Sequence, residues 1–522
     1  MSDWSQAVSA GKPAKPDSAA AGATITGNRG LRIEELLLFE QDRPGRTAVD
    51  LPEPPKVQSR LGTLARKQPV GLPGLAEPQV VRHFTRLSQK NYGIDVGTYP
   101  LGSCTMKHNP RLGERVARFA GFADIHPLQP QSTVPGAIEL MDTLAHWIKT
   151  LTGMPAVALS PAAGAHGELC GMMCIRAALM ARGEIRTRVL VPESAHGTNP
   201  ATAAACGYAV DPIPANAEGR VDLAALKAKL GPDVAALMLT NPNTCGLFET
   251  EIREIADAVH AAGAYFYCDG ANFNAIMGRV RPADLGIDVM HLNLHKTFST
   301  PHGGGGPGSG PVVMVAGLAP YAPVPWVVRG ADGLRLVEHS EGPAAESLGR
   351  LKQNHGQMGM FVRSLVYMMS HGADGLRQAA EDAVLNANYI LAGVKGELTP
   401  AFPGTCMHEV LFDDHFLAGT GVTTLDFAKA MIDEGFHPMT MYFPLVVHGA
   451  LLMEPTETES KEGLDLFISV IKGLARRAKS GDAEYFHAAP RLAPRRRLDE
   501  TLAARKPVLR WQPPPTDRQA AE

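Results

Sequence analysis

Short apolar runs alternate with segments of helical periodicity through the middle of the chain. The runs RVLVPE, ALMLT, AYFYCD, VMHLNLH and PVVMVA have the length and composition of strands. Between two of them, the segment EIREIADAVHAAG places four apolar residues at helical spacing: Ile252, Ile255, Ala256 and Val259. Strands that alternate with helices predict a mostly parallel sheet covered on both faces, so we expect an α/β fold.

The pattern changes on both sides of this region. After Ala316, long helical stretches and the short run HEVLF predict a smaller α+β domain. The first 80 residues are rich in proline and small residues, and the stretch after residue 485 is irregular and locally basic. We therefore predict an extended N-terminal arm over 1–80, a large α/β domain over 81–320, a small C-terminal α+β domain over 321–485 and a tail over 486–522.

Composition and charge exclude several classes of function. The chain has 522 residues, of which 45% are hydrophobic and 20% charged, as is usual for a soluble protein with more than one domain. A formal net charge of -3 argues against nucleic-acid binding, and no apolar run approaches the ~20 residues that cross a bilayer. The N-terminus lacks a secretory or transit signal, and the seven scattered cysteines indicate reduced thiols and no metal site. We expect a cytoplasmic protein that binds neither nucleic acid, nor membrane, nor metal.

Polar residues follow the strand-like runs, where ligands bind in sheets of this type. The turn SPAAGAHGE opens a helix, and its backbone N–H groups favour a phosphate at Gly164, Ala165 and His166, although an ordinary tight turn explains it equally well. His196 directly follows a strand and could stack on an aromatic cofactor ring, although a His in a loop is usually a surface residue. A further strand ends in a polar cluster that either binds a ligand or forms an Asx-type turn: Thr240, Asn241, Asn243 and Thr244.

Asp269 and Lys296 end two successive apolar runs. A buried carboxylate at Asp269 needs a cationic partner, which is either a protonated pyridine nitrogen or a structural salt bridge. Lys296 precedes the glycine-rich stretch GGGGPGSG, and burial would lower the pKa of its amine enough for covalent attachment to an aldehyde. A strand-end Asp, a strand-end Lys, an upstream His and an anion-binding turn together have the layout of fold-type-I pyridoxal-phosphate (PLP) enzymes.

At these residues the chain resembles a known family, the P-protein of the glycine cleavage system, glycine dehydrogenase (decarboxylating). The resemblance is to the separate subunit 2, which corresponds to the C-terminal half of the single-chain form. It spans about residues 80 to 480 and includes YPLGSCTMKHNP, PAAGAHGEL, ESAHGTNPA, NPNTCGLFE, the long run ending in NLHKTF, and MYFPLVVHGALLMEPTETESKE. It implies an aspartate-aminotransferase-like fold with a mostly parallel sheet and a smaller C-terminal domain.

The resemblance also implies a role for each site residue. Lys296 would carry PLP, Asp269 would pair with the ring nitrogen, and His196 would stack over the ring. His295 and the 164–166 turn would contact the phosphate. Lys296 and His196 are then the expected catalytic residues, and the expected cofactor-binding set is Lys296, Asp269, His196, His295, Gly164, Ala165, His166 and Thr244.

The implied activity is PLP-dependent decarboxylation of glycine with transfer of the aminomethyl group to the lipoyl arm of the H-protein, an oxidoreductase reaction by class. The implied partners are P-protein subunit 1, in an α2β2 heterotetramer, and the lipoylated H-protein. The arm and the tail are expected to contact subunit 1. The stretch GTYPLGSCTMKH either grips the carboxylate of glycine or packs structurally. Two alternatives remain: another PLP enzyme that acts alone (a decarboxylase, a desulfurase or an aminotransferase), and a catalytically silent scaffold subunit.

Overall fold

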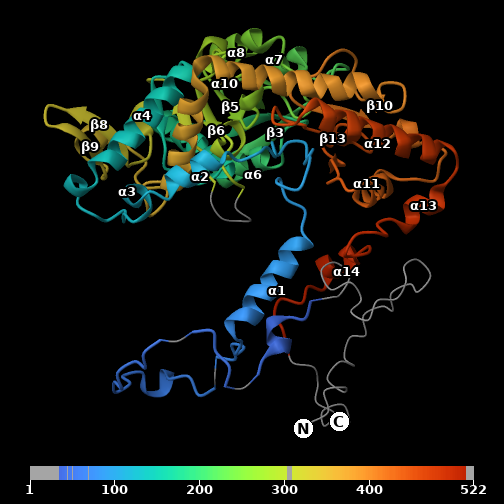
Figure 1. Ribbon diagram of the computed structural model, residues 1–522. Coiled ribbons are helices and arrows are strands. Elements are labelled where there is room, and N and C mark those ends of the chain that lie inside the picture. Colours follow the sequence, from blue (N-terminus) through green and yellow to red (C-terminus); the bar gives the residue numbers. More distant parts are fainter. Residues whose placement is uncertain (1–34, 44, 50, 69, 303–307, 513–522) are drawn as a thin grey trace. The chain divides into compact units, whose positions relative to one another are not determined.

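A computed structural model describes residues 35–43, 45–49, 51–68, 70–302 and 308–512 of the chain (Figure 1). The chain divides into two compact units, one formed by 1–93 with 490–522 and the other by 94–489. No helix among the described residues has both the length and the apolar character needed to span a bilayer. The predicted boundaries at 80, 320 and 485 stay predictions, and the glycine run 303–306 lies outside the described residues.

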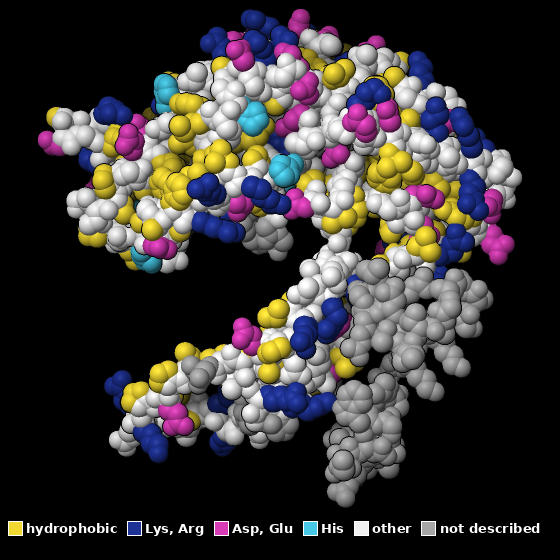
Figure 2. Space-filling model, in the orientation of Figure 1, with side chains coloured by type: hydrophobic (Ala, Val, Ile, Leu, Met, Phe, Trp, Pro, Cys, Tyr) yellow, Lys and Arg dark blue, Asp and Glu magenta, His cyan; other side chains and the backbone are white. Residues whose placement is uncertain are grey.

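The first unit contains little regular structure. Its elements are η1 (Leu38–Gln41), η2 (Gly62–Leu64), α1 (Glu77–Gln89) and α14 (Glu500–Arg505). Phe39 and Trp511 stack with their ring centroids 5.1 Å apart, which joins its two ends. Apolar side chains are exposed on α1, as Figure 2 shows, with Val81 and Phe84 55% and 54% exposed. This unit therefore leaves apolar surface uncovered within a single chain.

The second unit is built on a seven-stranded sheet with the order β1-β7-β6-β5-β4-β2-β3. The strands are β1 (Ala156–Ala158), β2 (Arg188–Pro192), β3 (Ala209–Ile213), β4 (Val234–Thr240), β5 (Tyr265–Gly270), β6 (Val289–Leu292) and β7 (Val312–Met314). Strands β2 to β6 pair in parallel, whereas β7 runs antiparallel to both β1 and β6. The mostly parallel sheet predicted from the sequence is confirmed.

Helices cover both faces of this sheet (Figure 1). They are α2 (Arg111–Ala117), α3 (Ala120–Ala123), α4 (Pro135–Thr152), α5 (Gly164–Ala181), α6 (Thr198–Ala205), α7 (Leu223–Lys229), α8 (Ile252–Ala261), α9 (Leu294–Thr297) and α10 (Met358–Val394), which is interrupted at Gly372. Phe266 packs into a core with α4, α8 and α10, and the next residue, Tyr267, packs into a core with α5. Because both faces are buried, strand residues are apolar without alternation.

The helix predicted around position 255 is α8. Its apolar stripe is buried as expected from the 3.6-residue period, and the chain leaves the helix through Gly263, which has a φ of 71°. Short 3-10 helices connect other elements: η3 (Gln131–Thr133), η4 (Phe273–Ala275), η5 (Pro282–Leu285), η6 (Ala319–Tyr321), η7 (Gly342–Ala344) and η8 (His415–Leu417). A hairpin of β8 (Trp326–Gly330) and β9 (Gly333–Val337) lies beside α4.

A second, antiparallel sheet follows α10, with the order β10-β11-β13-β12. Its elements are β10 (Thr399–Pro400), β11 (Val410–Asp413), β12 (Thr440–Met441) and β13 (Leu451–Met453), packed with α11 (Thr424–Asp433), α12 (Lys461–Lys479) and α13 (Ala483–Ala488) around a separate core. The run HEVLF leads into β11, as predicted. A bridge between Leu101 and Met453 brings the segment 99–109 against this sheet.

Candidate active site

Three parallel strands bring their carboxyl ends to one edge of the large sheet. Asp269 lies near the end of β5, in register with Thr240 on β4 and His291 on β6. Lys296 lies in α9, the short helix that follows β6. Its side chain is only 9% exposed, and its Nζ donates a hydrogen bond of 2.7 Å to the carbonyl oxygen of Ser103. The amine is therefore sheltered from solvent, as covalent chemistry at neutral pH requires.

Asp269 is 3% exposed, and neutral groups supply its hydrogen bonds. Its Oδ2 accepts from Asn199 Nδ2 at 3.0 Å, and its Oδ1 accepts from the backbone N–H of Ala271 at 2.9 Å. His291 Nε2 lies 3.3 Å from Oδ1, and the other ring nitrogen of His291 lies 2.6 Å from the hydroxyl of Tyr267. Burial lowers the pKa of His291 despite the nearby Asp269, so a neutral ring faces the carboxylate.

His196 lies in the loop that follows β2, at the same edge of the sheet. Its ring is exposed to solvent and contacts the Phe443 ring edge-on, with centroids 5.6 Å apart. Its Nδ1 lies 3.0 Å from the hydroxyl of Thr198. Partial desolvation lowers the pKa of His196, Asp269 opposes this and Lys296 adds to it, so the ring is neutral at pH 7.

The N-terminus of α5 lies against the turn that carries Lys296. Helix α5 begins at Gly164, close to Asn293, and its first N–H groups have no partner inside the helix. A loop that includes Ser309 and Gly310 joins both elements, because Gly310 N donates to Pro161 O at 3.0 Å and Leu294 N donates to Ser309 O at 3.1 Å. Several buried polar atoms here have no hydrogen-bond partner among the described residues: Ser160 Oγ, Asn293 Oδ1, His295 Nδ1 and Ser309 Oγ.

This arrangement fits an anion such as a phosphate. The hydroxyls of Ser160 and Ser309 can donate, and so can one ring nitrogen of His295. Burial, with the charges of His302 and Lys296, lowers the pKa of His295 to about 3, so the ring stays neutral. By contrast, His166 Nδ1 accepts a hydrogen bond of 3.2 Å from the backbone of Ala162 and thereby closes the turn.

The polar cluster after β4 is engaged largely within the protein. Asn243 Oδ1 accepts from the backbone N–H of Cys245 at 3.0 Å, which is the Asx-type turn that the sequence left as one of two readings. The buried hydroxyl of Thr244 donates to the carbonyl oxygen of Ser194 and so fixes the loop that leads to His196. A cofactor contact of Thr244 stays a prediction.

Two carboxyls near Lys296 did not stand out in the sequence. Glu409 Oε2 accepts from the backbone N–H of Ser103 at 2.8 Å, and Glu454 accepts from the backbone and the hydroxyl of Thr105 at 2.9 and 2.6 Å. Both side chains are fully buried, as is the neighbouring His408. Burial, and then Glu454, raise the pKa of Glu409 well above its usual range, so this carboxyl keeps its proton.

The segment 99–109 thus covers the amine of Lys296. Ser103 and Thr105 have positive φ values of 65° and 50°. Such values are usually found at glycine, so the sequence gives no sign of this backbone conformation. The HEVLF and MEPTETE stretches supply the two carboxyls from more than 300 residues away. Only the segment itself was singled out in the sequence, where binding and packing were equal alternatives.

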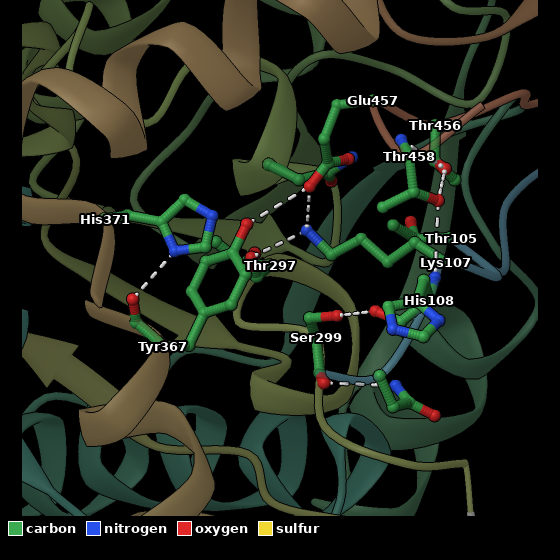
Figure 3. A network of polar contacts seen from close by, with 12 residues as sticks. Thr105, Lys107, His108, Thr297, Ser299, Tyr367, His371, Thr456, Glu457 and Thr458 are labelled. Atoms are coloured by element: carbon green, nitrogen blue, oxygen red, sulfur yellow. Dashed lines mark hydrogen bonds and ion pairs between the residues drawn. The ribbon is translucent and has the colours of Figure 1, made fainter. Parts of the chain in front are cut away.

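Lys107 anchors this segment (Figure 3). Its amine is 3% exposed and donates to the carbonyl oxygen of Thr297 at 3.0 Å and to Glu457 Oε1 at 2.6 Å. The hydroxyl of Tyr367 donates to the same Glu457 oxygen at 3.1 Å. Burial alone would lower the pKa of Lys107, but Glu457 outweighs it and the pKa is raised. The ion pair therefore ties the segment to Glu457, and the hydrogen bond to Thr297 ties it to the residue next to Lys296.

Replacing Lys107 with Met should lower the free energy of unfolding by about 3–5 kcal/mol, because Glu457 is left buried without its cation. The double variant Lys107→Met/Glu457→Gln should recover most of that loss, since neither charge remains. Urea unfolding measures both effects. The matched control is Lys461→Met, which breaks a solvent-exposed pair with Asp465 and should lower the free energy of unfolding far less. Equal costs for the two single variants would contradict this account.

Comparison with known proteins gives consistent likenesses. A family model described as glycine dehydrogenase, C-terminal domain, matches residues 379–490, and one described as aminotransferase class-V matches 171–305. The chain is 66% identical to a probable glycine dehydrogenase (decarboxylating) subunit 2 of Caulobacter vibrioides, over 98% of this chain and 99% of that protein. A protein of the same description from Desulforamulus reducens is 51% identical, over 92% of this chain and all of that protein.

Solved structures share the fold. A glycine decarboxylase (P-protein) of the glycine cleavage system in inhibitor-bound form matches with a TM-score of 0.67 and 22% identity, over 79% of this chain and 94% of that one. A structure of Oryza sativa TDC with PLP and tryptamine matches with a TM-score of 0.61 and 14% identity, over 81% and 92%. These likenesses confirm the predicted fold class, that of PLP-dependent enzymes of fold type I.

Proposed function

We infer the function from one fact: the chain belongs to the family of glycine dehydrogenase (decarboxylating) subunit 2. It is an enzyme subunit of the glycine cleavage system. We propose that the edge of the large sheet at Asp269 and Lys296 is its catalytic centre, with PLP as cofactor. The observation that carries this proposal is the sheltered amine of Lys296, held 2.7 Å from Ser103 O beside an anion-binding helix start.

PLP, when bound, supplies an electron sink for the carbanion that remains after glycine loses CO₂. Lys296 would hold the cofactor covalently. Ser160, Ser309, His295 and the start of α5 would bind its phosphate, because their buried polar atoms have no partner within the described protein. Asp269 can keep a proton on the ring nitrogen, since the groups that contact its carboxylate in the described part of the chain are neutral.

The chain also controls the surroundings of the reaction. The segment 99–109 excludes water from Lys296, and Glu409, which burial keeps protonated, adds no negative charge near this amine. His196, neutral at pH 7, can cover the ring and move a proton at its Nε2. Thr244 holds the His196 loop in place through Ser194.

We also propose the partners that this reaction requires. A separate subunit 1 would complete an α2β2 heterotetramer, and the lipoyl arm of the H-protein would accept the aminomethyl group. The exposed apolar residues of α1 support an interface in the first unit, where Val81, Phe84 and Leu87 leave a stripe uncovered. A cytoplasmic location stays a prediction.

Co-expression with subunit 1 tests the proposed function. The purified complex should bind PLP, exchange the carboxyl carbon of glycine with bicarbonate, and discriminate against alanine and serine when lipoylated H-protein is present. Full activity without subunit 1 and H-protein would instead favour an independent PLP enzyme. A complex that stays colourless with PLP would favour a silent scaffold.

A methyl group at Gly164 should weaken cofactor binding by about tenfold or more, as expected for an overpacked contact. A Cβ there would lie 2.4 Å from Asn293 Oδ1, three residues before Lys296, so either the helix start or the lysine turn must move. Titration of the apo complex with PLP measures the affinity. Gly136→Ala is the control, because a Cβ at that first-turn glycine of α4 meets nothing within 4 Å. Equal affinities for the two variants would rule out the phosphate cradle.

A further inference from the structure

Glu168 is a buried carboxyl that the proposed function leaves without a role. It lies in α5 and is 3% exposed, and its two carboxyl oxygens lie within hydrogen-bond distance of two hydroxyls of α6, Thr198 Oγ1 at 2.8 Å and Thr202 Oγ1 at 3.3 Å. One of its oxygens, an oxygen of Asp269 and a ring nitrogen of His291 lie within 4.8 Å of one another. A second carboxyl is thus placed beside the one that serves the cofactor.

The groups around Glu168 favour its protonated form. Burial and then the nearby Asp269 raise the pKa of Glu168 to about 8, against the two threonine hydroxyls and Lys296, which lower it. Tyr267 on β5 and His291 on β6 also face this region, but burial raises the pKa of Tyr267 well above its usual range and lowers that of His291. At neutral pH both rings are neutral, and Glu168 holds a proton that it can release.

Thr198 connects this carboxyl to the imidazole at the mouth of the site. Its hydroxyl oxygen lies 2.8 Å from Glu168 Oε1 and 3.0 Å from His196 Nδ1. The backbone N–H of Thr198 also donates to Nδ1 at 3.3 Å, which keeps this ring nitrogen oriented towards the hydroxyl of Thr198. A hydroxyl donates one hydrogen bond while it accepts another, so Thr198 can pass a proton between its two neighbours.

Building on the proposed function, we propose that Glu168, Thr198 and His196 form a proton relay that lets His196 give up a proton at Nε2 without the ring becoming charged. Glu168 and Thr198 are positioning residues in this relay, because they act through His196. The relay supplies the proton that the reaction consumes when a carbanion or the sulfur released from the lipoyl disulfide is protonated.

The proton balance is complete within three residues. At the start Glu168 is a neutral acid, and His196 carries its hydrogen on Nε2. When Nε2 releases that proton to the substrate, the Thr198 hydroxyl proton moves to Nδ1, and the Glu168 proton moves to the Thr198 oxygen. The ring ends neutral with its hydrogen on Nδ1, Thr198 is again a hydroxyl, and Glu168 is a carboxylate. The exposed Nε2 of His196 then takes a proton from solvent, the Nδ1 hydrogen moves to the Thr198 oxygen and the Thr198 hydroxyl proton moves to Glu168, which restores the starting state.

Kinetic pH profiles of the complex with subunit 1 test the relay. In the unaltered enzyme, kcat should fall as pH rises through the ionisation of Glu168, because the carboxylate has no proton to supply. Thr198→Val interrupts the path at nearly constant volume and should lower kcat about 10²-fold and remove that limb of the profile. Thr198→Ser restores a hydroxyl and should recover both. The KM for glycine should change little, because no residue of the relay is needed to bind it.

Thr202→Val is the matched control. It removes the other hydroxyl that contacts Glu168 but leaves the path to His196 intact. Because that hydroxyl stabilises the carboxylate, its loss should move the limb to higher pH without abolishing it. If the limb disappears equally in Thr202→Val and Thr198→Val, local packing explains both results and the relay is wrong.

Infrared difference spectra give a readout without turnover. In the complex, with or without PLP, the C=O band of a protonated carboxyl should bleach as the pH rises through about 8, the pKa of Glu168, and should be absent in Glu168→Gln. Absence of such a band in the unaltered protein would overturn the relay, and so would a Thr198→Val enzyme that keeps its kcat and its limb. Failure of the proposed function looks different: the unaltered complex would not exchange glycine's carboxyl carbon, while the Glu168 band would remain.

Discussion

Replacing Lys296 with Ala should abolish the exchange of glycine's carboxyl carbon with bicarbonate, with a loss of about 10⁴-fold or more, as expected when a covalent catalytic group is removed. Lys296 is only 9% exposed, and its amine is oriented by a hydrogen bond to Ser103 O. A free amine in solution therefore cannot take over its role, because it would reach the site at a much lower effective concentration and without this orientation. The visible absorbance of lysine-bound PLP should disappear as well, together with any adduct trapped by borohydride.

The variant should still fold, because the lysine has one hydrogen-bond partner and belongs to no ion pair among the described residues. Circular dichroism and assembly with subunit 1 check this point. Lys461→Ala, on the exposed face of α12, is the control for loss of a lysine and should leave the exchange rate unchanged. Exchange at the normal rate in Lys296→Ala would refute the assignment of the catalytic centre.

Replacing Asp269 with Asn should slow carbanion formation by about 10²–10³-fold, which corresponds to about 3–4 kcal/mol, in the range typical of a lost buried charge pair. The amide oxygen can still accept from the backbone N–H of Ala271, and Asn199 can turn its own amide so that its unpaired Oδ1 accepts from the new NH₂ group, so the fold should survive. Without the negative charge, however, nothing keeps the ring nitrogen of the cofactor protonated. Single-turnover release of CO₂ from glycine measures this step, and glycine binding should change much less.

A structural role of Asp269 predicts a different pattern. If the carboxylate served only as the partner of His291, 3.3 Å away, then His291→Gln should be as damaging as Asp269→Asn. We expect His291→Gln to retain most of the rate of carbanion formation, because the neutral ring contributes a hydrogen bond rather than a charge. If both variants lose the same rate of carbanion formation, then Asp269 serves only as a structural partner of His291.

The sequence predicted those parts of the site that depend on local structure. Asp269 lies at the end of one strand of a parallel sheet and Lys296 follows the next, and strand ends of such a sheet meet at one edge, so the sequence pattern predicts that they lie at the same edge. The helix start at Gly164 was found for the same reason, because a small-residue turn after a strand is visible in the sequence.

The parts that the sequence did not reveal depend on contacts between distant segments. Ser103 adopts a positive φ without being glycine, and its partner Glu409 lies beyond α10, so no local pattern links them. Glu168 resembles any polar residue of a helix until α6 brings Thr198 against it. The Asn243 turn remained ambiguous because the same amide can bind a ligand or its own backbone, and only the backbone geometry distinguishes the two.

The ion pair between Lys107 and Glu457 also affects the order in which parts of the site can form during translation. Residue 107 leaves the ribosome long before residue 457, and the acceptors for Ser103 and Thr105 are translated late as well. A nascent chain can therefore assemble the large sheet while the cover over Lys296 is still unfinished. The buried environment of Lys296 is therefore complete only once residues 409, 454 and 457 have been made, and fragments that stop before β11 contain Lys296 without the segment anchored over it.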